Sequence, residues 1–515
     1  MAKLYEYQGK ALLQKGGIPI PRGGIAKTKG EAKKIAEEIG GPVVVKAQAW
    51  VTGRAEAGGV KFARDPSETE NVAGEILGMG IKGFAVSEIL VEEKLDIERE
   101  FYLGMTVDDT AKLPTLVFGS VGGTGIEEIA REHPKKVFTV PIDVSTGLRG
   151  FEARNILRRA EIRGDLQRGL SDLFVKFYRV SGQNEARSAE INPLVLTKQG
   201  QIVAADSHFV IDDYAVFRHP ELGIEIAREF DRPATPLEKV AYQVEAKDHR
   251  GTFYFFQMER DFKPRTGYVG FHGAGGGGSM MSMDALLSQG FKVANYCDTS
   301  GNPSASKVYR AAKIILSQKN LEGYFASGSG VASQEQFHSA RGLVKAFREV
   351  DLSIPAVIRI GGNSEELAME ILHTYTEDLP GKVEAYGRDT SAVFCARRLR
   401  ELVGQWDYGR KGKSKWIGEE PGPSTYHFET LTGALYIRHE QCDTCTEKPC
   451  VQSCAAGILK FDDGRPVLTI PPEEAKKGRC TECLACELAC TSHGNKAISI
   501  DLPIPGLEEA LKKGA

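Results

Sequence analysis

The stretch 266–278, TGYVGFHGAGGGG, decides the fold of the second half of the chain, because it joins an apolar strand pattern to a glycine loop. A helical pattern, SMMSMDALLSQG, follows directly at 279–290. The same succession returns where EGYFASGSG (322–330) precedes the helical pattern of 331–350. Parallel strands that lead into helices through short glycine loops are typical of doubly wound α/β sheets. Residues 226–405 are therefore predicted to form a doubly wound α/β domain.

The first 225 residues mix helical and strand patterns. KGEAKKIAEEIG (29–40) has the charge and apolar spacing of an amphipathic helix, and the β-branched run PVVVKAQ (42–48) predicts a strand. Residues 1–225 are therefore predicted to form a separate α/β domain.

Eight of the ten cysteines lie between residues 442 and 490, near the end of the chain. Residues 406–427 are rich in Gly, Lys and Pro and have no periodicity, so they predict a linker. The cysteine-rich module is expected to occupy residues 428–502, followed by a short, charged helical tail at 503–515.

Bulk composition narrows the possible partners and location. A net charge of -3 and a pI near 6.4 give no sign of a nucleic-acid partner. No apolar run approaches the roughly 18 residues of a membrane span, and the start MAKLYEYQGKALLQ lacks the apolar core of a signal peptide. We expect a cytoplasmic protein with neither a membrane nor a nucleic acid as partner.

The cysteines form two runs with a repeated spacing. The runs are Cys442-x2-Cys445-x4-Cys450-x3-Cys454 and Cys480-x2-Cys483-x2-Cys486-x3-Cys490. Zinc would also suit paired CxxC motifs, but two runs of four with a closing x3 spacing favour iron–sulfur clusters. Disulfides conflict with the expected cytoplasmic location.

These runs resemble bacterial-type ferredoxins that hold two [4Fe–4S] clusters in a small α+β fold. The resemblance implies that one cluster takes Cys442, Cys445, Cys450 and Cys490, and that the other takes Cys480, Cys483, Cys486 and Cys454. The proline that usually follows the fourth cysteine is replaced by Ala455 and Thr491. That proline shapes a turn and is not a ligand.

Residues 1–400 carry four motifs in an order that resembles the ATP-grasp β subunits of succinyl-CoA synthetase. The motifs are YEYQGKALLQKGGIPIPRG (5–23), VVVKAQAWVTGRAEAGGVK (43–61), ILVEEKLDIEREFYLG (89–104) and EINPLVLTKQGQIVAADSH (190–208). The resemblance implies an ATP-grasp domain followed by a flavodoxin-like CoA-ligase domain.

The resemblance also implies the residues of a site for ATP or GTP. The residues expected to contact the nucleotide are Lys46, Gly53, Arg54, Ala55, Glu92, Leu95 and Glu100. Lysine and arginine supply charge to phosphates, and glycine lets the backbone approach them. Asn192 and Asp206 match the Mg²⁺ ligands, because hard cations prefer oxygen. Glu190 resembles the acidic group that orients a phosphohistidine.

The doubly wound domain is expected to bind the organic acid. Its loops at 272–278 and 328–331 open helices, whose N–H groups and dipoles can hold a carboxylate or phosphate. His272 stands where the family usually has asparagine, and the 328–330 loop reads Gly328, Ser329, Gly330. His272 could pair with an extra carboxylate or hydroxyl of a different acid, or could be a structural donor to a loop.

In the family mechanism, a histidine of an α subunit carries the phosphoryl group, and that subunit also binds coenzyme A. No stretch of this chain resembles either part. We therefore expect an α-type partner subunit, a small carboxylic acid as substrate, and a redox partner for the fused ferredoxin. The leading hypothesis is the β subunit of an acid–CoA ligase; the alternative is an electron-transfer or scaffold protein with a silent ligase body.

Overall fold

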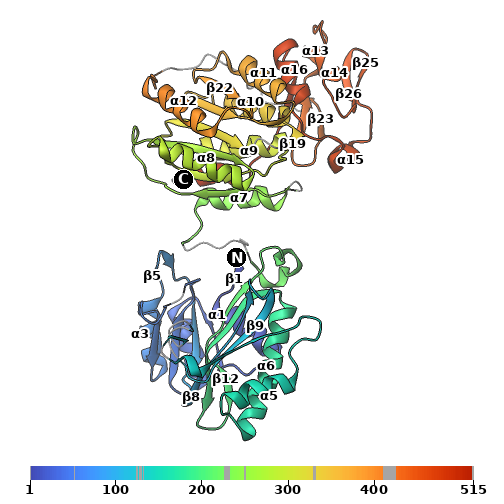
Figure 1. Ribbon diagram of the computed structural model, residues 1–515. Helices are drawn as coiled ribbons and strands as arrows, with labels where there is room; N and C mark the ends of the chain where they lie inside the picture. Colours follow the sequence, from blue (N-terminus) through green and yellow to red (C-terminus); the bar gives the residue numbers. More distant parts are fainter. Residues whose placement is uncertain are drawn as a thin grey trace. The chain divides into compact units, whose positions relative to one another are not determined.

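The computed structural model describes residues 2–51, 53–122, 126, 130–131, 133–224, 232–248, 251–328, 332–409 and 425–512. The chain divides into two units, Met1–Pro233 and Ala234–Ala515 (Figure 1). The predicted domain boundary at residue 225 and the centre of the predicted linker, 410–424, lie outside the described residues.

The first unit contains a larger antiparallel sheet in the order β1-β13-β11-β8-β9-β10, with β12 paired to β11. Helices α1, α5 and α6 bury their apolar residues in one core with these strands. The elements are β1 (Ala2–Lys3), α1 (Glu6–Lys15), β8 (Ile97–Asp108), β9 (Leu113–Gly119), β10 (Val137–Pro141), α5 (Gly150–Arg159), α6 (Gly164–Gln183), β11 (Ala186–Thr197), β12 (Ile202–Ala204) and β13 (His208–Ile211).

A smaller antiparallel sheet, β2-β7-β3-β4, carries α2 and α3 and has its own core. Its elements are β2 (Gly23–Ala26), α2 (Lys29–Ile39), β3 (Val43–Ala47), β4 (Val60–Ala63), α3 (Pro66–Ile76) and β7 (Ile89–Glu93), with a short hairpin β5 (Gly80–Ile81) and β6 (Phe84–Ala85). The predicted helix and strand at 29–48 are confirmed. Thr28 caps α2 by accepting from the Glu31 N–H at 3.2 Å, and Gly40 ends it with a φ of 74°.

The second unit begins with the predicted doubly wound domain, which is confirmed. Its sheet has the order β14-β17-β15-β18-β20-β22, and every strand of that path except β14 runs parallel to its neighbours. The five parallel strands therefore follow the flavodoxin-like order 2-1-3-4-5. The strands are β14 (Tyr254–Gln257), β15 (Tyr268–Ala274), β16 (Lys292–Val293), β17 (Asn295–Asp298), β18 (Gly323–Gly328), β20 (Ala356–Arg359) and β22 (Val383–Tyr386), with a separate pair β19 (Ala332–Glu335) and β21 (Gly362–Asn363).

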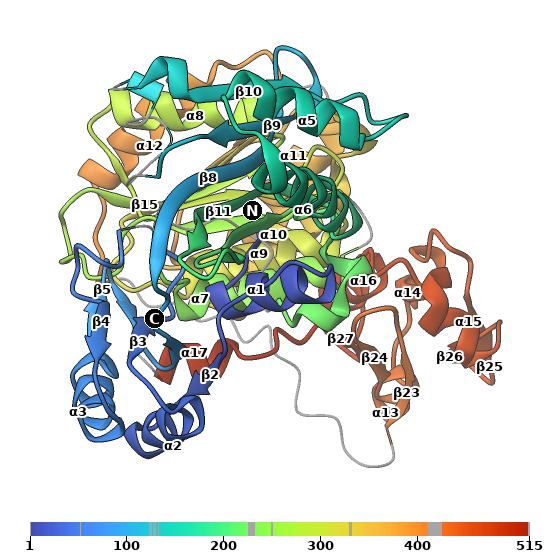
Figure 2. The same cartoon turned by 90° about the horizontal axis from the view of Figure 1, so that it is seen from below.

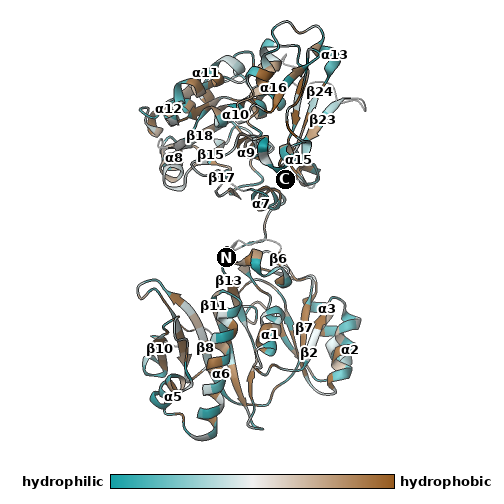
Figure 3. Ribbon diagram, turned by 90° about the vertical axis from the view of Figure 1, so that its right-hand side faces the viewer, coloured by the Kyte–Doolittle hydropathy of each residue, from teal (hydrophilic) through white to brown (hydrophobic). Residues whose placement is uncertain are grey.

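Helices cover both faces of this sheet (Figure 1). One face packs on α9 (Ala305–Leu316), α10 (Phe337–Glu349) and α11 (Glu365–Thr376), and the other packs on α8 (Gly276–Ser288) and α12 (Ala392–Gly404). Helix α7 (Pro236–Ala246) packs beside β14. Hydrophobic colouring follows the strands of the sheets, as expected for buried layers (Figure 3).

The cysteine-rich module consists of a three-stranded sheet, β23-β24-β27, a hairpin, β25-β26, and short helices. Its elements are β23 (Tyr426–Glu429), β24 (Ala434–Ile437), α13 (His439–Cys442), α14 (Pro449–Gln452), β25 (Leu459–Asp462), β26 (Arg465–Leu468), α15 (Pro472–Glu474), α16 (Ala485–His493) and β27 (Ile498–Asp501). The predicted tail contains α17 (Leu507–Lys512), which packs on α7.

The module is packed against the doubly wound domain and shares one hydrophobic core with it. Helix α16 lies next to α10, and the β25-β26 hairpin lies farther out (Figures 1 and 2). Two buried contacts hold this interface. Lys345 Nζ lies 2.8 Å from Glu487 Oε1, and Arg310 donates to the carbonyl oxygens of Thr432 and Pro503, each at 3.0 Å.

Within the described part of the chain, no helix is long and apolar enough to cross a lipid bilayer.

The glycine loop after β15 leaves no room for a side chain at Gly273. A Cβ there would overlap Ser279 Oγ and would lie 2.8 Å from the carbonyl oxygen of Cys297. We expect Gly273→Ala to lower the free energy of unfolding of the second unit by about 2 kcal/mol, because strand and helix must move apart. Thermal unfolding would show this as a lower Tm. Gly277→Ala is the control, since nothing lies within 4 Å of its added Cβ; equal Tm values for the two variants would contradict this packing.

Candidate functional site

Six charged side chains meet in the first unit and are called the Glu6 cluster. The members are Glu6, Lys10, Lys46, Arg54, Glu92 and Asp206. Glu6 is the centre: its carboxylate lies 2.7 Å from Lys46 Nζ, 2.8 Å from Lys10 Nζ and 2.8 Å from Arg54 Nη1. The cluster therefore joins the first helix to the strand and loop that carry the predicted phosphate-binding cations.

The outer contacts of the cluster bring in two more predicted residues. Glu92 lies 2.6 Å from Lys10 and 3.2 Å from Lys46, and Asp206 Oδ2 lies 3.0 Å from Arg54 Nη2. Lys10 and Lys46 also donate to the carbonyl oxygen of Ala205, at 2.8 and 2.6 Å. Three cations thus face three carboxylates at one place.

The electrostatics of Glu6 depend on its neighbours. Burial alone would raise the pKa of Glu6, but Lys10, Lys46 and Arg54 together hold it well below its usual value. Burial would lower the pKa of Lys46, but Glu6, Glu92 and Asp206 raise it well above its usual value. Glu6 and Lys46 are therefore both charged at neutral pH.

Of the predicted magnesium and phosphohistidine residues, Glu190 and Asn192 lie on β11, and Asp206 lies in the connection between β12 and β13. Pro193, which follows Asn192 in β11, accepts a hydrogen bond from the Ala205 N–H through its carbonyl oxygen, at 3.1 Å. Asn192 and Asp206 therefore lie on adjacent segments. Glu190 is half-buried in β11, and the Tyr102 hydroxyl donates to its carboxylate at 3.3 Å.

The other predicted nucleotide residues lie outside the Glu6 cluster. Gly53, with a φ of 76°, and Ala55 flank Arg54 in the loop between β3 and β4. Leu95 lies between β7 and β8, and Glu100 is exposed on β8. Contact of these residues, and of Glu92, with a bound base or ribose stays a prediction.

Sequence reasoning missed Glu6 and Lys10. Both are buried, at 4% and 1% exposure, in a helix that opens the chain. Their only local signal is an opposite-charge pair at i and i+4, which is usually a solvated surface pair.

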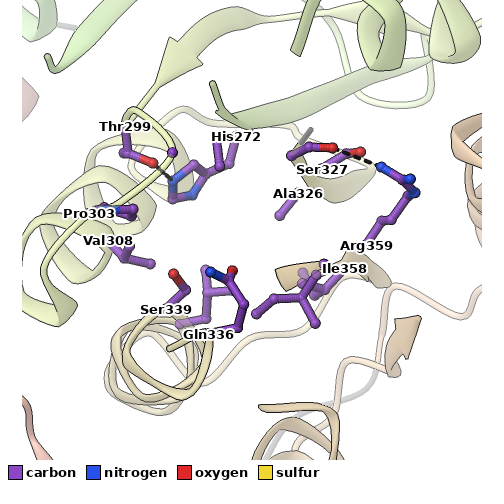
Figure 4. Close-up of a pocket in the computed structure, with 16 residues that line it drawn as sticks. His272, Thr299, Pro303, Val308, Ala326, Ser327, Gln336, Ser339, Ile358 and Arg359 are labelled. Carbon is purple, nitrogen blue, oxygen red and sulfur yellow. Dashed lines mark hydrogen bonds between the residues drawn. The ribbon is translucent and has the colours of Figure 1, made fainter. Parts of the chain in front are cut away.

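The strand order of the doubly wound sheet reverses between β15 and β18. A cavity lies at this point and is called the switch-point cavity (Figure 4). Ligands of flavodoxin-like sheets bind at this position, beyond the carboxyl ends of the strands. Polar groups on its wall come from His272, Thr299, Ser327, Gln336, Ser339 and Arg359.

His272 lies in the wall of this cavity with both ring nitrogens engaged. Nδ1 lies 2.5 Å from the Tyr324 hydroxyl and Nε2 lies 3.2 Å from Thr299 Oγ1. Burial lowers the pKa of His272 to about 4, so the ring is neutral at pH 7. The ring can therefore orient Thr299 toward a ligand but does not offer a positive charge.

Arg359 supplies the positive charge of the cavity, and sequence reasoning missed it. It donates to the carbonyl oxygens of Gly328 at 2.7 Å, Thr390 at 2.5 Å and Arg388 at 3.0 Å. Among the described residues no carboxylate forms an ion pair with Arg359. Its position at the carboxyl end of β20, two residues before a pair of glycines, was the available signal. Of the predicted 328–330 loop, Gly328 lies here, and Ser329 and Gly330 lie outside the described residues.

The eight clustered cysteines, all free thiols, fall into two sets by mutual electrostatic contact. The outer site groups Cys442, Cys445, Cys450 and Cys490. The inner site groups Cys454, Cys480, Cys483 and Cys486, which also line one cavity. Within the residues that the structure describes, no three His, Cys, Asp or Glu side chains form a group arranged to hold a metal ion.

The loops that carry these cysteines have unusual backbone. Lys448, Glu482 and Leu484 have φ values of 46°, 50° and 62°. Side chains other than glycine rarely adopt this left-handed conformation, and it is most unfavourable for a bulky residue such as leucine. The backbone of both cysteine loops therefore turns sharply at these positions.

Comparisons with known proteins agree with both halves of the ligase prediction. A family model described as an ATP-grasp domain matches residues 3–196, and one described as ATP citrate lyase citrate-binding matches residues 263–397. The GDP-forming succinate–CoA ligase subunit beta of Thermus thermophilus is 39% identical over 369 residues, which is 72% of this chain and 93% of the relative. The ADP-forming subunit beta of Chloroflexus aggregans is 38% identical over 372 residues, which is 72% of this chain and 92% of that relative.

Solved structures show the same fold. ATP citrate lyase from Methanothrix soehngenii, in complex with citrate and coenzyme A, matches with a TM-score of 0.64 at 19% identity, over 78% of this chain and 99% of that chain.

Removing the centre of the Glu6 cluster should strongly destabilise the first unit. We expect Glu6→Gln to lower its free energy of unfolding by about 3 to 5 kcal/mol at pH 7, because three buried cations lose their shared partner. The pKa of Glu6 is depressed in the folded state, so its contribution is present above about pH 4.5 and is lost as the pH falls below that value. Urea unfolding at several pH values measures both effects.

Glu93→Gln is the matched control, because Glu93 pairs with the exposed Arg22 at 2.8 Å and should contribute less than about 1 kcal/mol. Equal destabilisation by the two variants at pH 7 would show that the Glu6 cluster does not have this role.

Proposed function

Because the chain belongs to the succinate–CoA ligase β-subunit family, we propose that it is the nucleotide-binding and acid-binding subunit of an acid–CoA ligase. The observation that carries the proposal is the meeting of Lys46, Arg54 and Asp206 in the Glu6 cluster. Two buried cations beside a carboxylate are what a nucleotide triphosphate with its magnesium ion requires.

Each residue of that site then has a task. Lys46 and Arg54 bind the phosphates, while Asn192 and Asp206 would hold Mg²⁺, which supplies charge to the phosphate oxygens. Asp206 pairs with Arg54 at 3.0 Å. Nucleotide binding therefore gives Arg54 a phosphate in place of Asp206 and frees Asp206 for the metal. This reorganisation exchanges one ion pair for two and keeps the buried charge balanced.

The phosphoryl group is proposed to pass to a histidine of an α-type partner subunit, which also binds coenzyme A. Glu190 would accept from the imidazole of that histidine and hold it toward the nucleotide, and the Tyr102 hydroxyl fixes the Glu190 carboxylate. The predicted partner is supported by relatives that are named as subunits.

The acid is proposed to bind in the switch-point cavity, with a carboxylate on Arg359. Thr299, Gln336 and Ser339 add neutral hydrogen-bonding groups, which suit a hydroxyl or a further carboxylate of the acid. We infer a small polycarboxylic acid of the citrate type, which the citrate-binding family match over residues 263–397 supports. Succinate is the second candidate, because the curated relatives are named for it.

The cysteine-rich module is proposed to be a ferredoxin with one [4Fe–4S] cluster at each site. The two thiol sets have the crossed membership that the ferredoxin resemblance implies, since Cys454 groups with the second run and Cys490 with the first. The coiled loops at Lys448 and Leu484 suit a chain wrapped around a compact inorganic core. When bound, such clusters supply one-electron transfer to a redox partner.

Neutralising Arg359 should weaken acid binding. We expect Arg359→Gln to bind citrate and succinate about 10- to 100-fold less tightly than the parent chain, because a charged hydrogen-bond donor is lost. Isothermal titration calorimetry on the full chain measures this, and Arg359→Lys should recover part of the affinity. Arg388→Gln is the control, since its guanidinium pairs with Glu365 at 3.1 Å. Unchanged affinity in Arg359→Gln would contradict an acid site in this cavity.

Removing one inner-site thiol should halve the bound metal. After reconstitution with iron and sulfide under anaerobic conditions, we expect about eight irons per parent chain and about four in Cys483→Ser. Iron analysis and electron paramagnetic resonance measure the loss. Cys395→Ser is the control, because Cys395 lies on α12 and is buried in the core of the doubly wound domain. Equal iron in both variants, or zinc in place of iron, would refute the ferredoxin assignment.

A further inference from the structure

Helix α10 touches both the switch-point cavity and the cysteine-rich module. Its first half contributes Ser339 and Leu343 to the cavity wall, and Gln336 precedes it there (Figure 4). Its second half packs on α16, where the buried Lys345 pairs with Glu487, the residue that follows Cys486. One rigid element therefore runs from the proposed acid site to the inner site.

Arg341 lies on α10 between these two contacts. It is half-buried, its guanidinium is stacked 4.6 Å from the centre of the Phe337 ring, and its charge interacts with Cys483 and Cys486. In the part of the chain that the structure describes, Arg341 has neither a hydrogen bond nor an ion pair.

A partly desolvated guanidinium without an acceptor is unfavourable. A protonated thiol cannot neutralise it, but a [4Fe–4S] cluster on four thiolates has a net negative charge in both of its common oxidation states. The missing counter-charge of Arg341 is therefore one that a cluster at the inner site would provide.

We propose that α10 links the oxidation state of the inner-site cluster to anion binding in the switch-point cavity, with Arg341 as the residue that sets the cluster potential. This inference rests on the proposed function, because it assumes both the cluster and the acid site. The step itself is simple. An external one-electron donor reduces the cluster, which gains one negative charge, and no bond is made or broken.

The sign of the link follows from charge. Helix α10 rises about 1.5 Å per residue, so Ser339 and Arg341 are only about 3 Å apart along its axis. An acid carboxylate on the Ser339 side of α10 and an added electron on the Arg341 side are like charges, which repel each other across the helix. The bound acid should therefore make the cluster harder to reduce. Reciprocity requires that the reduced protein bind the acid less tightly.

The test is a redox titration of the reconstituted full chain, followed by electron paramagnetic resonance, with and without saturating citrate or succinate. We expect the acid to lower one midpoint potential by about 40 mV, which corresponds to about fivefold weaker acid binding by the reduced protein at 59 mV per tenfold. The outer-site potential should move less.

Variants of Arg341 test whether this residue sets the cluster potential. Without acid, Arg341→Gln should lower the same potential, because the reduced cluster loses its cation, whereas Arg341→Lys should retain it. Arg400→Gln is the matched control, since Arg400 is also stacked on a phenylalanine, at 5.3 Å from the centre of the Phe291 ring, but on α12. A shift of equal size in Arg400→Gln would overturn the role of Arg341.

The outcomes separate this inference from the proposed function. A cluster signal and calorimetric heat of acid binding, together with an unshifted potential, would overturn the link alone. Absence of a cluster signal, or of acid binding, would overturn the proposed function and the link together.

Discussion

Burying cations away from water is the constraint that the rest of this structure depends on. A buried cation needs either a counter-charge or a set of hydrogen-bond acceptors. Which of the two surrounds a given cation indicates the kind of ligand that the cation can bind. In the Glu6 cluster, Lys46 and Arg54 form ion pairs with carboxylates. A nucleotide that binds these cations must therefore replace ion pairs to carboxylates with ion pairs to its phosphates. Among the described residues, Arg359 is held by carbonyl oxygens alone, which position the guanidinium and leave its charge for the proposed acid.

The same reasoning connects the cysteine-rich module to the ligase chemistry. Lys345 is matched within the protein by Glu487, and it fixes α16 to α10. Arg341, one turn earlier on the same face, has no ion pair among the described residues, and its proposed counter-charge is a cluster at the inner site. The module is thus packed into the core of the second unit. The sequence alone indicated a linker and an appended domain, because a Gly, Lys and Pro-rich segment carries no information about where the next domain docks.

Much of the fold could be predicted because its signals are local. The glycine loops after β15 and β18 stand out from apolar strands, and Thr28, Glu31 and Gly40 mark both ends of α2. The grouping of the thiols was implied by the resemblance to ferredoxins, which two short cysteine runs are enough to reveal. These features need only a few neighbouring residues to be recognised.

The parts that could not be predicted depend on contacts between distant segments. Glu6 and Lys46 are 40 positions apart, and Lys345 and Glu487 are 142 positions apart. A charge on a helix looks the same in sequence whether it is solvated or buried under a later strand. For His272 the substitution was visible, but its two hydrogen bonds and its neutral ring come from Tyr324 and Thr299, which follow it by tens of residues.

The most direct test of the central claim, that this chain is the working β subunit of an acid–CoA ligase, is a single-turnover phosphoryl transfer. The chain, copurified with an α-type subunit, would be mixed with magnesium and γ-labelled ATP or GTP, and the protein-bound label followed before and after adding coenzyme A with citrate or succinate. We expect a labelled histidine on the partner subunit that is discharged only when a cognate acid is present, with acyl-CoA formed in equal amount. A label that no carboxylic acid discharges, or nucleotide binding without any label, would contradict this claim.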